Sequence, residues 1–246
     1  MNLNPPHQQI QKEISQMKSD CSPKNILFGQ KYIGTNKPYH GFSTKQIINL
    51  AKKITEQNKL DSNQLIDLLN SLYQNGQSYT EIVLGPMILS HYPETLKNFD
   101  PKNLDIWLNY TCGWAEDDVL CQSIFTAENV LNKWSDWLKI LKKFNKDPNI
   151  NKRRASLVLL TKPLRQSNDL RLSKLAFENI ENLNGEKEIL ITKAVSWALR
   201  SLITFHKDEV LIYLENNKDS LPKIAYREAL SKALTGKKYV NKSKQK

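Results

Sequence analysis

Apolar residues recur at helical spacing along nearly the whole of this 246-residue chain. The first two clear stripes are Ile47, Leu50, Ala51 and Ile54, followed by Leu65, Leu68, Leu69 and Leu72. Residues at this spacing lie on one face of a helix, where they can be buried together. The chain has only eight glycines, which argues against an all-β protein with many tight turns. The pattern therefore predicts an all-α fold.

The expected helices follow one another with short turns between them. Ser43 or Thr44 is the expected cap of the first stripe, Ser62 of the second, and Asp100 with Pro101 opens a helix through Trp107. Later helices are expected at residues 79–91, 117–132, 134–144, 150–161, 168–181, 187–205, 208–215 and 221–234. Antiparallel helix pairs repeating about every 35 to 40 residues are typical of a HEAT-like α-solenoid. Periodicity alone would equally allow an irregular helical bundle.

The two ends of the chain differ in composition from the single helical domain that we expect between them. Residues 1–22 are polar, contain Pro5-Pro6, and are expected to form a loosely attached amino-terminal extension. Residues 23–236 carry the helical repeats, and residues 237–246 form a lysine-rich tail that we expect to be disordered. Pro86 and Pro163 are expected to kink or end the helices in which they lie.

The net charge of +11 favours a polyanionic partner, but charge alone does not distinguish DNA from RNA or a membrane surface. Three cysteines without CxxC spacing indicate reduced thiols, and four scattered histidines give no zinc motif. The sequence has no phosphate-binding glycine loop, no signal sequence and no apolar run long enough to cross a bilayer. We therefore expect a cytoplasmic protein without a metal or a small-molecule cofactor.

A tryptophan lies among cations in the segment from Lys193 to Arg200. On a helix, Lys193, Trp197, Arg200 and Thr204 share a stripe that is separate from the apolar stripe of Ile191, Val195, Leu199 and Leu202. Cations can bind a nucleic-acid backbone while an aromatic ring contacts a base or a sugar. Core packing is the ordinary alternative for a tryptophan.

Two further segments supply residues of the same kind. Trp114 is followed four positions later by Asp118, although an aspartate here can also cap a helix. Arg153 and Arg154 enter a helix that then becomes apolar on every side. An arginine in such a helix must reach either solvent or an internal counter-ion.

These three segments resemble the AlkD-like DNA alkylation-repair glycosylases, which are built of HEAT-like repeats. Trp114 with Asp118, Arg154 before Ala155, and Trp197 within Lys193 to Arg200 match that family's motifs. The resemblance continues more weakly from Tyr32 to the helix of Arg227, Glu228 and Ala229. Gly113 and Asn151 depart from the family pattern, where aromatic residues are often found.

The resemblance implies a base-excision-repair enzyme that hydrolyses the N-glycosidic bond of 7-methylguanine and 3-methyladenine in duplex DNA. It implies that Asp118, Trp114, Trp197 and Arg154 are catalytic and that Lys193, Arg200 and Arg153 bind DNA. It also implies a monomer that needs no metal and sits on the nucleoid when bound to DNA. Whether the base is rotated out of the helix is left open.

Two other kinds of function fit a basic helical-repeat chain. One is a non-catalytic protein that binds bent or branched DNA, for which Asp118 is not needed. The other is a scaffold for a protein partner, for which an acidic or apolar concave face is expected. The stripe of Lys193, Trp197 and Arg200 argues against the scaffold.

Overall fold

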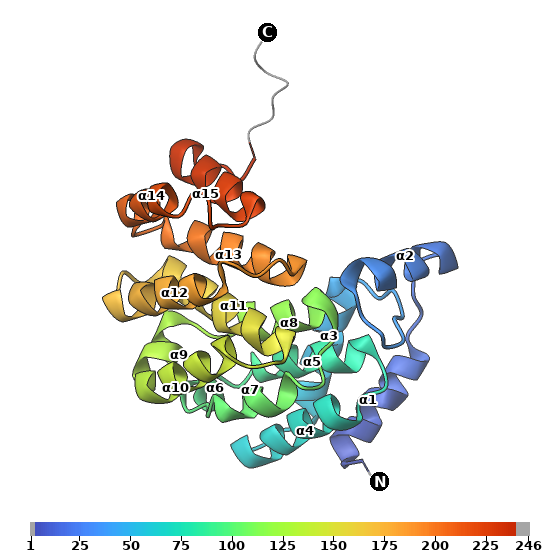
Figure 1. Ribbon diagram of the computed structural model, residues 1–246. Helices are drawn as coiled ribbons and strands as arrows, with labels where there is room; N and C mark the ends of the chain where they lie inside the picture. Colours follow the sequence, from blue (N-terminus) through green and yellow to red (C-terminus); the bar gives the residue numbers. More distant parts are fainter. Residues whose placement is uncertain (1–2, 240–246) are drawn as a thin grey trace. The chain divides into compact units, whose positions relative to one another are not determined.

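The computed structural model describes residues 3–239, which form fifteen helices and no strands (Figure 1). The all-α prediction is therefore confirmed. By their internal contacts, the helices fall into two compact units, residues 1–124 and 125–246, which are described separately below. In neither unit does a described helix have the length and apolar character needed to cross a membrane.

The first unit contains eight helices. They are α1 (Pro5–Gln16), α2 (Pro23–Ile33), α3 (Thr44–Gln57), α4 (Ser62–Asn75), α5 (Tyr79–Leu89), α6 (Pro93–Lys97), α7 (Lys102–Trp107) and α8 (Gly113–Gln122). Helix α5 packs against α1, α3, α4, α6 and α8 and is buried on nearly every side. The stripes predicted around Ile47 and Leu65 are buried against this centre.

The amino-terminal stretch packs more closely than its polar composition indicates. Asn4 caps α1, and His7, Ile10 and Ile14 of this helix are buried against α3, α4 and α5. Nε2 of His7 lies 3.0 Å from Oε1 of Glu81, so a polar side chain makes one of the main contacts. The first 22 residues therefore contain a docked helix as well as a polar linker.

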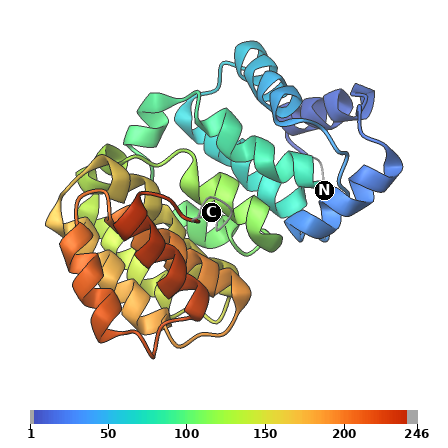
Figure 2. The ribbon, with the colours of Figure 1, turned by 90° about the horizontal axis from the view of Figure 1, so that it is seen from above.

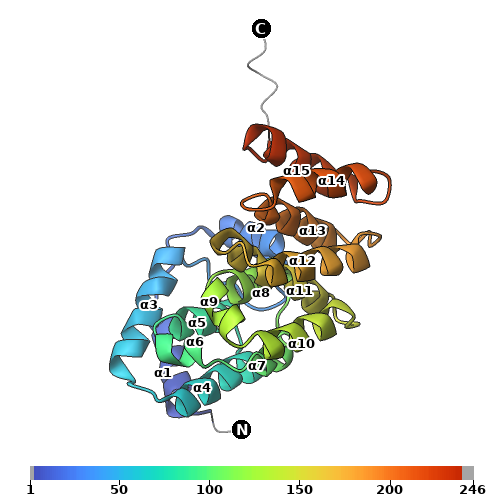
Figure 3. The ribbon, with the colours of Figure 1, turned by 90° about the vertical axis from the view of Figure 1, so that its left-hand side faces the viewer.

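The second unit contains seven helices. They are α9 (Ala127–Asn132), α10 (Trp134–Asn145), α11 (Ile150–Gln166), α12 (Leu170–Leu183), α13 (Ile189–Leu202), α14 (Lys207–Asn216) and α15 (Lys223–Thr235). Helices α11, α13 and α15 pack side by side in one row, and α10 and α12 contact each other in a second row. Figures 1 and 3 show the successive helices of this unit stacked one above another. In Figure 2, which is seen from above, α15, in red, lies on the near side of this unit. Two such rows are what stacked helix pairs produce.

Several helix boundaries differ from the prediction. Asp61, rather than Ser62, caps α4, and the helix expected at 117–132 is two helices because Thr126 caps a new one. The helix expected to stop at residue 161 continues to Gln166 with Pro163 inside it. Proline removes one backbone donor and crowds the preceding turn, but here the surrounding side chains are buried and the helix is maintained.

Lys237, Lys238 and Tyr239, which begin the expected disordered tail, contact α15. The carbonyl of Lys237 accepts a hydrogen bond from the Ser231 hydroxyl, and Lys238 and Tyr239 both contact Glu228. Residues 240–246 of the tail lie outside the described part of the chain.

Candidate active site

Helix α8 begins with an unusual turn that places Trp114. Gly113 has a φ of +75°, and a Cβ at this position would lie 2.4 Å from the carbonyl oxygen of Ile33. Only glycine adopts this conformation readily and allows such a close approach. The departure from the family pattern at Gly113 therefore has a local structural reason.

Trp114 is held against the end of α2. Its indole N–H donates to the carbonyl oxygen of Tyr32 at 2.8 Å, and the two rings meet edge to face with centroids 5.5 Å apart. The indole is half-buried, so part of the ring still faces solvent. Core packing, the ordinary alternative for a tryptophan, does not describe this residue.

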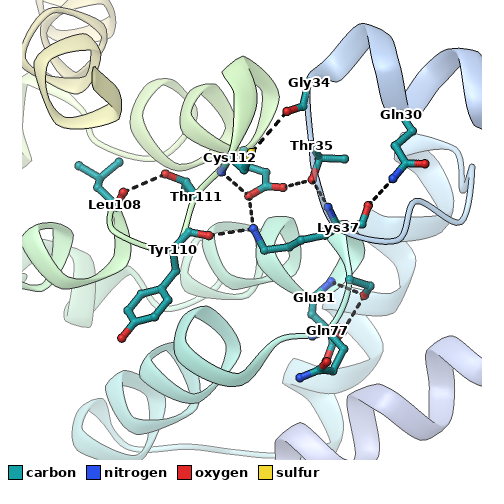
Figure 4. A network of polar contacts seen from close by, with 12 residues as sticks. Gln30, Gly34, Thr35, Lys37, Gln77, Glu81, Leu108, Tyr110, Thr111 and Cys112 are labelled. Atoms are coloured by element: carbon teal, nitrogen blue, oxygen red, sulfur yellow. Dashed lines mark hydrogen bonds and ion pairs between the residues drawn. The ribbon is translucent and has the colours of Figure 1, made fainter. Parts of the chain in front are cut away.

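A buried carboxylate, that of Glu116, fixes the same turn. Its oxygens accept hydrogen bonds from the Cys112 backbone N–H at 2.8 Å and from the Thr35 hydroxyl at 2.5 Å. Lys37 donates to the same carboxylate at 2.9 Å and also to the carbonyl oxygen of Tyr110 (Figure 4). Because α8 begins at Gly113 with Cys112 at its N-cap, Asp117 and Asp118 lie inside the helix, and neither is the cap that the sequence allowed.

Asp118 lies one turn after Trp114 on α8, as the four-residue spacing predicts. Its side chain is half-buried, whereas the neighbouring Asp117 is completely buried. A separate cavity of about 420 Å³ in this unit is lined mainly by apolar residues, including Ile48, Met87 and Val119. Its lining includes neither Trp114 nor Asp118, so it does not mark the predicted site.

In the second unit, Arg154 is almost fully buried at the start of α11, with 3% of its surface exposed. Its Nη1 donates to the carbonyl oxygen of Leu190 at 2.6 Å, which ties it to the start of α13. Because the guanidinium of Arg154 is buried, a ligand could contact it only by approaching the start of α11 closely.

Arg153 has partners of its own within the protein. Its Nε and Nη2 bind the two carboxylate oxygens of Glu186 at 2.8 and 3.2 Å. Its Nη1 donates to the carbonyl oxygens of Asp147 and Pro148. The bidentate pair ties α11 to the loop between α12 and α13, and the two carbonyl contacts hold the loop before α11. These contacts support a structural role, and DNA binding by Arg153 stays a prediction.

Helix α13 presents its predicted polar stripe outside its buried one. Lys193 is exposed, and Trp197 and Arg200 are half-buried, while Ile191, Val195, Leu199 and Leu202 are completely buried. The guanidinium of Arg200 lies 3.7 Å from Glu228 of α15 and 3.3 Å from the Ser196 hydroxyl. Arg200 therefore combines a neutralising partner with partial exposure.

Sequence reasoning missed Arg165, which lies beside this stripe. Its Nη1 donates to the Ser201 hydroxyl at 3.0 Å, and burial together with the nearby charge of Arg200 lowers its pKa. Burial and the charge of Arg165 in turn lower the pKa of Lys162. Arg165 belongs to the last turn of α11, whereas the sequence predicted that this helix ends at residue 161, so Arg165 was not considered as part of it.

Glu228 was also missed as a site residue, although its segment carried part of the resemblance. Burial raises the pKa of its carboxyl. Hydrogen bonds from Ser196 and Tyr239 and the charge of Lys238 together lower this pKa by more, so the pKa lies below its ordinary value. The Ser196 and Tyr239 hydroxyls donate at 2.6 and 2.8 Å. A charged Glu228 thus links α13, α15 and the first tail residues.

The described residues contain no cluster of three or more histidine, cysteine or carboxylate side chains that could hold a metal ion. The residues predicted for the site are a carboxylate, cations and aromatic rings. In the first unit, these are Asp118 and Trp114. In the second unit, they are Arg154, Lys193, Trp197 and Arg200.

Comparison with known proteins identifies a family and a similar solved structure. The model of the DNA alkylation repair enzyme family matches residues 13–233. A solved structure described as a predicted DNA alkylation repair enzyme from Enterococcus faecalis has a TM-score of 0.60 and 17% sequence identity, over 89% of this chain and 98% of that one. No curated protein matches. The family model covers most of the chain, and the chain therefore belongs to the DNA alkylation repair enzyme family.

Proposed function

We propose that the protein is a monofunctional DNA glycosylase that hydrolyses the N-glycosidic bond of cationic alkylated purines, 7-methylguanine and 3-methyladenine, in duplex DNA. The observation that carries the proposal is the first part of α8, where a half-buried aspartate lies one turn after a fixed tryptophan. Family membership supports DNA as the substrate.

Hydrolysis of the N-glycosidic bond of a cationic purine requires little catalysis beyond a well-placed carboxylate. A purine alkylated on a ring nitrogen is already a good leaving group, and breaking its bond to the sugar develops positive charge on the sugar. A carboxylate about 4 Å from that charge contributes on the order of 4 kcal/mol at an effective dielectric constant of about 20. This corresponds to roughly a thousandfold in rate. Asp118 is proposed to supply this charge and to orient the attacking water.

The aromatic and basic residues are proposed to hold the nucleotide. Trp114 and Trp197 present partly exposed indole rings that suit apolar contact with a sugar and cation-π contact with a charged base, worth about 0.5–2 kcal/mol each. Lys193 and Arg200 are suited to phosphates. The burial of Arg154 favours a role in orienting its neighbours, with a phosphate or a carboxylate as its counter-ion.

Asp118→Asn tests the proposal because it keeps the shape of the side chain and removes its charge. We expect release of 7-methylguanine and 3-methyladenine from methylated duplex DNA to slow by about ten- to a thousandfold, while DNA binding persists. The assay measures the freed bases by chromatography, and a chelator is added in parallel to check that no metal is needed. The control is Asp219→Asn, in the loop between α14 and α15, where the side chain is exposed.

Two outcomes would contradict the proposal. One is a purified wild-type protein that releases no base above the spontaneous rate. The other is an Asp118→Asn variant as active as the parent. Either result would move the protein to the non-catalytic class that binds bent or branched DNA.

A further inference from the structure

One face of α2 is exposed along its whole length. Lys24, Leu27, Phe28, Lys31 and Tyr32 are all exposed and occupy positions i, i+3, i+4, i+7 and i+8, so they form one stripe along the helix. We call these five residues the outward stripe of α2. Leu27, Phe28 and Tyr32 are 55%, 70% and 65% exposed. Figures 1 and 2 show α2, in blue, at an edge of the first unit.

The outward stripe is not needed to attach α2 to the protein. Helix α2 packs on α8, with Ile33 buried at its end. Gln30 donates to the carbonyl oxygen of Lys37, which secures the loop that follows. Single exposed apolar residues are common, but three neighbouring ones on a stripe with two lysines favour a binding surface.

The stripe is continuous with a residue of the candidate active site. The Phe28 and Tyr32 rings are nearly parallel, at 10°, with centroids 6.3 Å apart, and Tyr32 meets Trp114 edge to face. The indole of Trp114 also donates to the Tyr32 carbonyl oxygen. Three aromatic rings therefore run from the exposed face of α2 to the start of α8.

The charge of α2 identifies the kind of partner. The helix carries two lysines and no carboxylate between residues 23 and 33. Aromatic rings between cations suit a nucleic-acid strand, since the cations bind phosphates and the rings stack on bases or sugars. An acidic protein helix would also match the charge, but continuity with Trp114 in a DNA-repair family favours DNA.

We propose that the outward stripe of α2 binds the DNA strand next to the altered nucleotide. Lys24 and Lys31 contact phosphates, and Phe28 and Tyr32 contact a base or sugar exposed where the duplex is disturbed. The placement of this stripe beside the altered nucleotide rests on the proposed function. It extends the DNA contact beyond every residue that the sequence motifs identified.

The first test measures binding of Phe28→Ala to fluorescein-labelled undamaged duplexes, one fully paired and one with a single unpaired nucleotide. Loss of a stacking ring should weaken binding to the second duplex by about five- to fiftyfold, and binding to the first by less. The matched control is Ile212→Ala on α14, where an equally exposed apolar side chain (63%) is removed from the other unit. Its affinity should equal that of the parent.

The second test measures the salt dependence of binding for the double variant Lys24→Gln with Lys31→Gln. Each lost phosphate contact should reduce the slope of log affinity against log salt by about 0.9, so the double variant should lose nearly two. Lys52→Gln on α3 is the control, because that exposed lysine already pairs with Glu56 at 3.7 Å. All substituted side chains are exposed, so the variants should fold like the parent.

Unchanged affinity of Phe28→Ala for both duplexes would overturn the proposal, and so would an unchanged salt slope of the double variant. A parent that sediments as a dimer, and becomes a monomer on Phe28→Ala, would also overturn it and assign the stripe to a second copy of this chain. The proposed function can fail separately. If the parent releases no methylated base but Phe28→Ala still weakens DNA binding, the surface stands and the glycosylase proposal does not.

Discussion

Two helices of the first unit, α5 and α8, begin with the same arrangement. Glu81 accepts a hydrogen bond from the backbone N–H of Gln77, and Glu116 accepts one from that of Cys112, four residues earlier in both cases. Both glutamates are at most 2% exposed. Each therefore satisfies a backbone donor at the start of a buried helix, and each needs further donors to remain in the interior.

The further donors come from different kinds of structure. Glu81 is met by His7 and Gln11, both on α1, so it joins one helix to another. Glu116 is met by Thr35 and Lys37, which lie in the loop after α2. That loop begins at Gly34, two residues after Tyr32, whose carbonyl oxygen binds the Trp114 indole. The same kind of buried carboxylate thus joins two helices at Glu81 and helps to place a candidate site residue at Glu116.

The largest expected effect comes from removing the charge of each glutamate in turn. Glu81→Gln and Glu116→Gln should each lower the free energy of unfolding by about 2–4 kcal/mol, because buried donors lose a charged acceptor. Only Glu116→Gln should also slow base release per folded molecule, since only its partners lie in the loop that follows Tyr32, the residue that contacts Trp114. Urea unfolding measures the first effect, and single-turnover release of methylated purines measures the second.

Thr35→Val provides a milder version of the same test. It removes one neutral donor to Glu116 and should cost about 1 kcal/mol. If Glu81→Gln and Glu116→Gln reduce turnover equally, or if neither does, then Glu116 acts only in folding and the comparison fails.

Gly113→Ala tests the backbone conformation at the start of α8. The residue has a φ of +75°, and the added Cβ would meet the Ile33 carbonyl, so we expect a loss of about 1–3 kcal/mol of stability. Gly185→Ala is the control, because nothing lies within 4 Å of a Cβ at that position and its φ is not positive. That change should be nearly neutral. Equal urea midpoints for the two variants would show that the start of α8 is not constrained as described.

The sequence predicts the helices better than their ends. The stripe of Ile47, Leu50 and Ile54 locates α3, because burial of one helix face requires this spacing. Helix α2 was not predicted, since three of its apolar residues, Leu27, Phe28 and Tyr32, are exposed and the helix has no buried stripe. The end of α11 was misplaced because a proline ordinarily stops a helix, whereas tertiary burial maintains this one.

The candidate site shows a similar division. Trp114 and Asp118 could be proposed from one short segment, because residues four apart share a helix face. The contacts of Glu116 could not, since Thr35 and Lys37 are about 80 residues away in the sequence. Pairing over such distances is set by the fold as a whole. Nothing local in the segment indicates which of its three carboxylates is buried and paired in this way.

A further expected effect concerns acid. Burial raises the pKa of Glu81, but hydrogen bonds from His7, Ser78 and Gln11 lower it further, so its folded-state pKa lies below the unfolded value of about 4.3. Such a group stabilises the fold above the unfolded pKa, and this contribution is lost as pH falls through the folded pKa. The stability difference between the parent and Glu81→Gln should therefore be constant from about pH 7 to 5 and shrink below about pH 4. Urea unfolding across this range measures it. A difference that persists undiminished at about pH 2 would mean that the charge of Glu81 is not what α1 and α5 depend on, and the parallel with Glu116 would then rest on shape alone.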